Sequence, residues 1–238
     1  MNTHTLLSVA VLSASGLAMA APASAQVIFS EDFDDANGQA VADVTPDVGL
    51  GFRQTNGPAV IVTDGAIDTT GAARTIFGDF TTTSLDASTP YLDVTADFTK
   101  FNFNEGYAGV SLYSGDQEIF FFGDPGGGDP ATESIGIDAR TTDEFRSGVR
   151  DLGLYTFRYD SITGEIALYS GSTASGSPLV SAATGEIGLS FDSFRIENGS
   201  GGDIGVSSIV VAANAVPEPS TALLGGLGML TLVARRRR

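Results

Sequence analysis

The chain of 238 residues contains no cysteine and no tryptophan, and its one histidine is His4. Because that histidine lies in a segment with the features of a cleaved export signal, described below, we expect the mature chain to have none. These absences exclude Ser-His-Asp and Cys-His catalysis, and zinc or copper sites built from His or Cys. They also exclude disulfides, so a conventional hydrophobic core must hold the exported body together.

Positive charge is scarce outside the C-terminus. Four of the 12 basic residues are the terminal arginines, which leaves eight against 29 acidic residues over residues 26–220, a formal net charge of −21. A charge this negative opposes binding to nucleic acid and to anionic lipid surfaces. It also offers many oxygens to divalent cations, although we expect most of these carboxylates simply to be solvated.

Residues 1–25 have the features of a secretory signal peptide. A nearly uncharged apolar stretch of 15 residues leads to the small-residue site Ala23-Ser24-Ala25, so cleavage there leaves Gln26 as the first residue. Ala18-Met19-Ala20 is a competing cleavage site. A short core strand is the alternative reading, but a strand does not need so long an uncharged run, and export is favoured.

The C-terminus has three parts that differ in kind: Pro217-Glu218-Pro219-Ser220, the uncharged run Thr221–Ala234, and Arg235–Arg238. The prolines predict an exposed, extended spacer, because they neither extend a helix nor donate a backbone hydrogen bond. A helix of the uncharged run reaches roughly 21 Å, short of the ~30 Å hydrocarbon core, but arginine stems extend its reach. We therefore expect a membrane-inserted helix with a cytoplasmic arginine cluster; the alternative is a buried helix of a soluble domain.

This three-part order resembles the PEP-CTERM sorting signal of bacterial exported proteins. The resemblance covers residues 216–238, with Thr221-Ala222 standing where that family commonly has an aromatic residue. It implies processing by an exosortase-type membrane enzyme and transient contact with the inner membrane. Release or attachment at the cell surface or in the extracellular polysaccharide matrix would follow. We assign residues 215–238 to this signal and residues 26–214 to the body.

The body is predicted to be β throughout, because it has no window with a helical period, and the 30 glycines and nine prolines of the whole chain punctuate it at strand-like spacing. Apolar residues alternate with polar ones from Leu92 to Phe98, which is typical of a strand with one wet face. A hairpin is predicted where Ser161–Gly164 joins two alternating segments, and another at Asp64-Gly65. The strand-like segments are 27–33, 59–62, 66–68, 92–98, 107–113, 118–122, 155–159, 165–169, 191–197 and 206–211. Together they predict a two-sheet antiparallel β-sandwich.

Four segments of the body resemble concanavalin-A-like, laminin-G-type jelly rolls: Phe29–Asp34, Gly109–Leu112, Tyr155–Tyr159 with the turn at Gly164, and Phe191–Ile196. The resemblance implies a jelly-roll fold and spans residues 27–212 loosely. Lectins, adhesive modules and glycoside hydrolases share this fold, so the fold alone does not choose a function.

The sequence favours a protein without catalytic activity. Hydrolases of this fold commonly carry Glu-x-Asp-x-(x)-Glu along one strand, and that pattern is absent. Glu31–Asp35 is rich in acid but opens the body, and Asp143-Glu144 and Glu105 lie beside turns. We expect a structural or glycan-associating protein of the surface or matrix. The alternatives are a secreted polysaccharide hydrolase and a lectin-like module.

Sugar binding without tryptophan would need tyrosine platforms. Tyr107, Tyr113 and Tyr169 are the candidates at strand ends, with packing at a sheet edge as the alternative.

No cofactor is expected other than calcium, which prefers carboxylate and carbonyl oxygens. One candidate site is the glycine-rich loop 123–130 with Asp124 and Asp129, for which a loop without ligand is the alternative. The other combines Asp32 and Asp34 with Asp203, because the two chain ends of jelly rolls usually lie side by side.

Overall fold

The computed structural model describes residues 25–70, 72–103, 106–126, 133–139, 144–199 and 201–214. Several predicted features lie outside these residues: Ala23 of the cleavage site, the motif Pro217–Ser220, the C-terminal helix, Glu105, Asp129 and Asp143. Within the described part of the chain, no helix combines the length and apolarity needed to cross a membrane.

The described chain is built almost entirely of strands. Its elements are β1 (Gln26–Glu31), the 3₁₀ helix η1 (Val41–Asp43), β2 (Gly51–Asn56), β3 (Ile67–Asp68), β4 (Arg74–Ser84), β5 (Tyr91–Phe101), β6 (Ala108–Ser114), β7 (Gln117–Asp124), β8 (Ile135–Ala139), β9 (Phe145–Val149), β10 (Gly153–Asp160), β11 (Glu165–Ser170), β12 (Val180–Ala183), β13 (Ser190–Asn198) and β14 (Ile204–Asn214).

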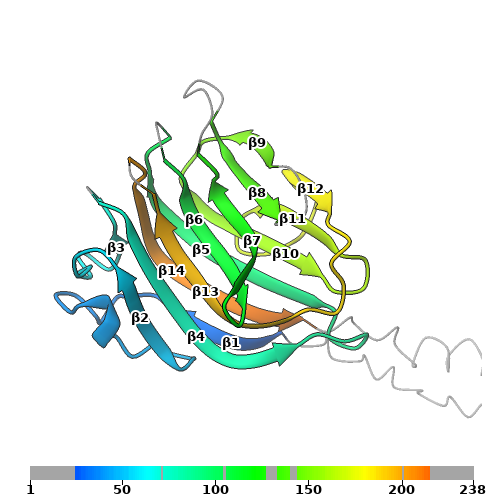
Figure 1. Cartoon of the computed structure of the whole chain (residues 1–238), viewed down its shortest axis with the longest axis horizontal. Coiled ribbons are helices and arrows are strands. Elements are labelled where there is room, and N and C mark those ends of the chain that lie inside the picture. Colours follow the sequence, from blue (N-terminus) through cyan, green and yellow to red (C-terminus); the bar gives the residue numbers. More distant parts are fainter. Residues whose placement is uncertain are drawn as a thin grey trace, which may run out of the picture. The chain divides into compact units, whose positions relative to one another are not determined.

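These strands form two antiparallel sheets, one lying over the other (Figure 1). Sheet I has the order β1-β14-β5-β10-β11-β12, with β3 also pairing β14. Sheet II has the order β2-β4-β13-β6-β7-β8-β9. The predicted all-β, two-sheet jelly-roll sandwich is therefore confirmed.

Aromatic side chains fill the space between the sheets. Phe122 of sheet II stacks on Phe157 of sheet I, with ring centroids 5.5 Å apart and planes inclined by 14°. Phe120 lies 5.0 Å from Tyr159, and Phe29 meets Phe194 edge-on at 4.7 Å. Burying one such ring contributes about 1.5–3 kcal/mol, so this aromatic core can hold the fold without disulfides.

The alternating segments fold as predicted. Leu92–Phe98 lies within β5, and β10 pairs β11 with Phe157 opposite Leu168. The turn at Asp64-Gly65 is also present, with φ angles of 51° and 70°. The residues before that turn differ from the prediction, because residues 59–62 form only the isolated bridge between Ile61 and Ala40.

The first and last strands pair with each other, as the position of the chain ends predicted. Gln26 of β1 lies opposite Ala213 of β14. On its other side β14 pairs β5, with Asn214 opposite Tyr91. The last strand is therefore held on both edges nearly to its end, and the segment that carries the sorting motif follows it directly.

Candidate functional site

The outer face of sheet II carries a row of polar and aromatic side chains. Strand alternation produces it: Val110 and Leu112 enter the core, whereas Ser111 and Tyr113 between and beyond them point outward. Cross-strand pairing then aligns one residue from each of six strands, in the order Arg53, Phe77, Arg195, Ser111, Phe121 and Asp138.

Guanidinium groups and rings pack against each other along this row. Arg53 lies 3.8 Å from the centre of the Phe77 ring, and Phe77 meets Tyr113 edge-on at 5.2 Å. Arg195 lies 4.8 Å from the centre of the Tyr113 ring. Each such contact stabilises the fold by about 0.5–1 kcal/mol at exposed sites and by more where water is excluded, so these contacts hold the row of side chains in one arrangement.

Two carboxylates meet at the centre of the outer face. Glu118 accepts hydrogen bonds from Arg195 Nη2 at 2.8 Å and from Ser111 Oγ at 2.5 Å. Glu197 is bonded to the same Arg195 nitrogen and lies 3.1 Å from the same hydroxyl. Glu197 is only 3% exposed, whereas the Glu118 side chain is 40% exposed. Arg195 therefore compensates a buried charge that has little access to water.

Burial sets the protonation behaviour of this cluster. Desolvation raises the pKa of Glu197, and the nearby Glu118 raises it further, while Arg195 and the Ser111 hydroxyl act against the rise. The pKa of the Tyr113 hydroxyl is also raised, chiefly by burial and then by Glu118, so this group stays neutral. Glu197 is therefore a buried carboxyl group that binds a proton more readily than an exposed one, and Arg195 and Ser111 hold it in place.

Two adjoining cavities open on the outer face. One of about 450 Å³ is lined by Glu118, Phe121 and Asp138 together with the turn between β6 and β7. A second of about 230 Å³ shares those three residues and adds Tyr107, Pro125, Arg195 and Glu197. The shared lining makes them one cleft, which runs from the β6–β7 turn to Tyr107.

Three glycines lie side by side on the outer face of sheet II. Gly109, Gly123 and Gly136 lie opposite one another on β6, β7 and β8, in register with Glu197 of β13. A Cβ on Gly109 would lie 2.5 Å from the ring of Phe121. That ring therefore lies over the glycine, which explains why a strand tolerates a residue that weakens it.

The three candidate tyrosine platforms have different environments. Tyr107 is 42% exposed at the rim of the cleft. Tyr113 is buried beneath Arg195 and is excluded as a platform, since only 5% of it is exposed. Tyr169 is half-buried on the opposite sheet. Of these three tyrosines, only Tyr107 therefore exposes its ring to solvent on the outer face of sheet II.

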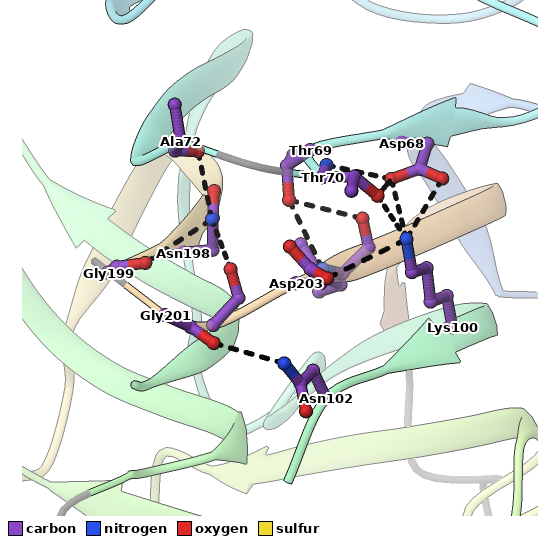
Figure 2. Close-up of polar contacts among 12 residues, drawn as sticks. Asp68, Thr69, Thr70, Ala72, Lys100, Asn102, Asn198, Gly199, Gly201 and Asp203 are labelled. Carbon is purple, nitrogen blue, oxygen red and sulfur yellow. Dashed lines mark hydrogen bonds and ion pairs between the residues drawn. The ribbon is translucent and has the colours of Figure 1, made fainter. Parts of the chain in front are cut away.

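The calcium-site candidates lie in separate places. The backbone amide of Asp34 lies 3.3 Å from Asp32 Oδ1, so these two are neighbours after β1. Asp203 instead faces Lys100 at 3.7 Å, beside Asp68 and Thr70 (Figure 2). Strand β3 explains this placement, because β3 occupies the edge of β14 beyond β1.

Figure 2 also shows why the loop before β14 is fixed. The Asn198 side-chain amide donates to the carbonyl oxygens of Ala72, Gly199 and Gly202, and the Asn102 amide donates to Gly201. These bonds tie the loop that holds Asp203 to neighbouring segments. Asp203 is therefore positioned to pair with Lys100 and not with the carboxylates that follow β1.

Asp124, the remaining described candidate, is fully buried and lies 3.6 Å from Arg146. No group of three or more His, Cys, Asp or Glu side chains in the described ranges is arranged to hold a metal ion. Calcium binding stays a prediction without geometric support. Comparing thermal unfolding of residues 26–214 in millimolar calcium and in chelator tests it.

Asp124 makes the stability of the sandwich depend on pH. Desolvation raises its pKa to about 6, with Glu133 and Glu144 adding to the rise, although the Gly126 amide and Arg146 oppose it. The folded protein therefore binds this proton more tightly than the unfolded chain, whose value is 3.8. The stabilisation is complete below about pH 4 and is lost as pH rises through about 6.

We expect the Asp124→Asn variant to remove this pH dependence, which is on the order of 2–3 kcal/mol. Urea unfolding between pH 4.5 and 7.5 measures it. Asp79→Asn, at a partly exposed ion pair, is the control and should keep the slope of the wild type. An unchanged slope in Asp124→Asn would show that another group is responsible.

Comparison with solved structures indicates the fold class of the body. The CBM2 module of the Lactobacillus casei BL23 phage J-1 evolved Dit is 11% identical with a TM-score of 0.52, over 82% of this chain and 99% of the module. Lectin II from Ulex europaeus is 13% identical (TM-score 0.48; 80% and 100% covered). A β-1,3-glucanase from Mycobacterium marinum is 10% identical (TM-score 0.47; 78% and 98% covered). At 11% identity the likeness to the module is one of fold, and it agrees with the two antiparallel sheets of the body, a jelly-roll sandwich.

A second comparison concerns the C-terminal segment. Residues 215–238 match the PEP-CTERM protein-sorting motif, as the resemblance of Pro217-Glu218-Pro219 and the arginine cluster implied. The motif marks the chain as an exported, surface-directed protein. The comparison with curated proteins found no match to this chain.

The residues of the central cluster were not selected from the sequence. Glu118, Arg195 and Glu197 lie in strands that were predicted, and alternation with Phe194 and Ile196 places Arg195 and Glu197 outward. The sequence does not reveal that β13 pairs with β6 and that β6 pairs with β7, and this pairing brings the three residues together.

Proposed function

We propose that this protein is an exported, non-catalytic component of the cell surface or extracellular matrix that binds polysaccharide in the cleft on sheet II. The cleft carries the proposal: it combines the exposed ring of Tyr107 with polar groups at Glu118 and Asp138, and the largely buried Phe121 adds apolar surface to its lining. Ligand sites typically pair apolar walls with a few fixed polar groups. The faces of sugar rings and their hydroxyls suit such a lining.

The charge of the cleft favours neutral glycans. Its described lining includes the acids Asp116, Glu118, Asp138 and Glu197 against the single base Arg195. Polyanions such as alginate would meet this charge and that of the whole body, so their binding is opposed. The sorting motif supports a destination where polysaccharide is available, through an exosortase-type enzyme and transient contact of the tail with the inner membrane.

A glycoside hydrolase is the second candidate, and one observation favours it. Glu118 and Glu197 contact the same hydroxyl at 2.5 and 3.1 Å, so the two contacting oxygens are at most about 5.6 Å apart. Retaining enzymes hold their two carboxyl groups ~5–5.5 Å apart. Their environment argues against catalysis. Glu197 has a 4% exposed side chain and is bonded to Arg195, so it is poorly placed to reach an anomeric carbon.

The test uses residues 26–214, which have their own core and are expected to fold alone. We expect retention in gels containing soluble β-glucan or galactan, weaker retention with alginate, and no release of reducing ends from any of the three. Reducing ends that disappear in Glu118→Gln would establish the hydrolase instead. Absence of retention by all three glycans would overturn the binding function.

A further inference from the structure

A further cavity, of about 170 Å³, lies on the outer face of sheet I. It is lined by Tyr91 of β5, by Arg158 and Asp160 of β10, and by Glu165, Ala167 and Tyr169 of β11. Alternation makes this the outer face, because the intervening Leu92, Tyr159, Ile166 and Leu168 are fully buried in the core. The cavity and the cleft of sheet II therefore open on opposite sides of the sandwich.

A fixed arginine forms one wall of the cavity. Arg158 donates from Nε and Nη2 to the two oxygens of Asp93, at 2.7 and 2.6 Å, and its guanidinium lies 4.6 Å from the centre of the Tyr91 ring. Asn214 also donates to Asp93, at 2.7 Å. A bidentate pair of this kind holds the guanidinium plane in place, and it leaves Nη1 without a hydrogen bond among the described residues.

Tyr169 forms another wall of the cavity. Its ring makes no stacking or cation contact, and its hydroxyl no hydrogen bond, within the described parts of the chain. Ala167, opposite Arg158 in the β10–β11 ladder, supplies a low floor between the walls. The exposed Glu165 adds hydrogen-bond acceptors at the rim.

We propose that this cavity is a second carbohydrate site, which takes one neutral sugar unit of a polysaccharide, and that the protein therefore bridges two glycan chains. Tyr169 offers an apolar ring face, Arg158 Nη1 a donor and Glu165 acceptors, which together match a ring with equatorial hydroxyls. Anions are disfavoured, because Asp93 neutralises Arg158 while Asp160 and Glu165 add negative charge. The inference rests on the proposed function, since the ligand class of the two sites is the same.

Bridging is measured with residues 26–214 added to immobilised β-glucan, followed by soluble fluorescent β-glucan; galactan and alginate are run in parallel. The wild type should capture the fluorescent chain. Tyr169→Ala should still bind the immobilised glycan yet capture about five- to thirtyfold less of the second chain, because a lost ring contact costs about 1–2 kcal/mol. Tyr169→Phe, which keeps the ring, is the matched control and should bridge.

Each outcome decides the proposal. Wild-type protein that binds but does not bridge, or Tyr169→Ala that bridges as well as the wild type, overturns the second site while the first stands. No binding of any glycan overturns both. If Tyr169→Ala unfolds, Ala167→Gln fills the cavity from its floor and must likewise abolish bridging. Bridging through a dimer with one site per chain would survive both substitutions, and would therefore also contradict the proposal.

Discussion

Replacing Arg195 by alanine is expected to destabilise the sandwich by about 3–5 kcal/mol, which is the usual cost of removing one partner of a buried ion pair. Arg195 is bonded to Glu118 and Glu197, and the Glu197 side chain is 4% exposed. Without the guanidinium, Glu197 must either remain buried as an uncompensated anion or take up a proton. Urea unfolding at constant m-value measures the loss.

Two comparisons separate this effect from a general loss of packing. Arg53→Ala removes a similar guanidinium from the same face, but its pair with Asp79 is 48% and 32% exposed and should be worth about 1 kcal/mol or less. Arg195→Ala combined with Glu197→Gln should recover much of the stability, because the uncompensated charge is gone. A cost for Arg195→Ala no larger than that for Arg53→Ala would contradict the cluster as described.

The pH dependence of the Arg195→Ala variant has a definite sign. Burial already raises the pKa of Glu197, and losing Arg195 removes an influence that lowers it. The folded variant therefore binds the proton more tightly than the unfolded chain does. Its penalty should shrink at acidic pH, where Glu197 is neutral, and grow as pH rises through the pKa of the folded state.

The second large effect concerns processing at the C-terminus. Residues 215–238 match the PEP-CTERM motif, so the exported protein is expected to lose the tail near Pro217-Glu218-Pro219. Glu218→Ala should leave the whole precursor in the membrane fraction. Intact-mass measurement of both forms decides this, and Asn214→Ala, immediately before the matched residues, is the control that should be processed normally. An exported species that still ends in Arg238 would show that the tail is a lasting anchor.

The position of the last strand adds to this expectation. Ladder pairing holds β14 on both edges, to Ala213 by β1 and to Asn214 by β5. Cleavage near Pro217 therefore leaves every strand intact. The processed protein and a fragment of residues 26–214 should unfold at the same temperature, within the error of the measurement.

Local pattern was enough to predict strands whose polar and apolar residues alternate. Strand β5 and the β10–β11 hairpin show that pattern over several residues, so their faces were assigned correctly. Strand β4 was missed because Gly78 interrupts its apolar face and residues 81–84 are polar. Gly78 is explained by the neighbouring strand β13, because a Cβ at this position would lie 2.1 Å from the ring of Phe194.

The candidate site depended on contacts between distant segments, which the sequence does not specify. Ser111 and Glu197 are 86 residues apart, and only the pairing of β6 with β13 joins them. The same limitation affected Asp203. The sequence placed the chain ends together correctly, but it did not reveal that β3 would bring Asp68, and β5 Lys100, beside that carboxylate.

The central claim, polysaccharide binding in the cleft of sheet II, is tested most directly at Tyr107. This ring is 42% exposed, so its removal should leave the fold intact. In β-glucan or galactan affinity gels, Tyr107→Ala is predicted to weaken binding about five- to thirtyfold, from the loss of 1–2 kcal/mol of ring contact, while Tyr107→Phe binds like the wild type. Equal retention of wild type and Tyr107→Ala, with both proteins folded, would contradict the account.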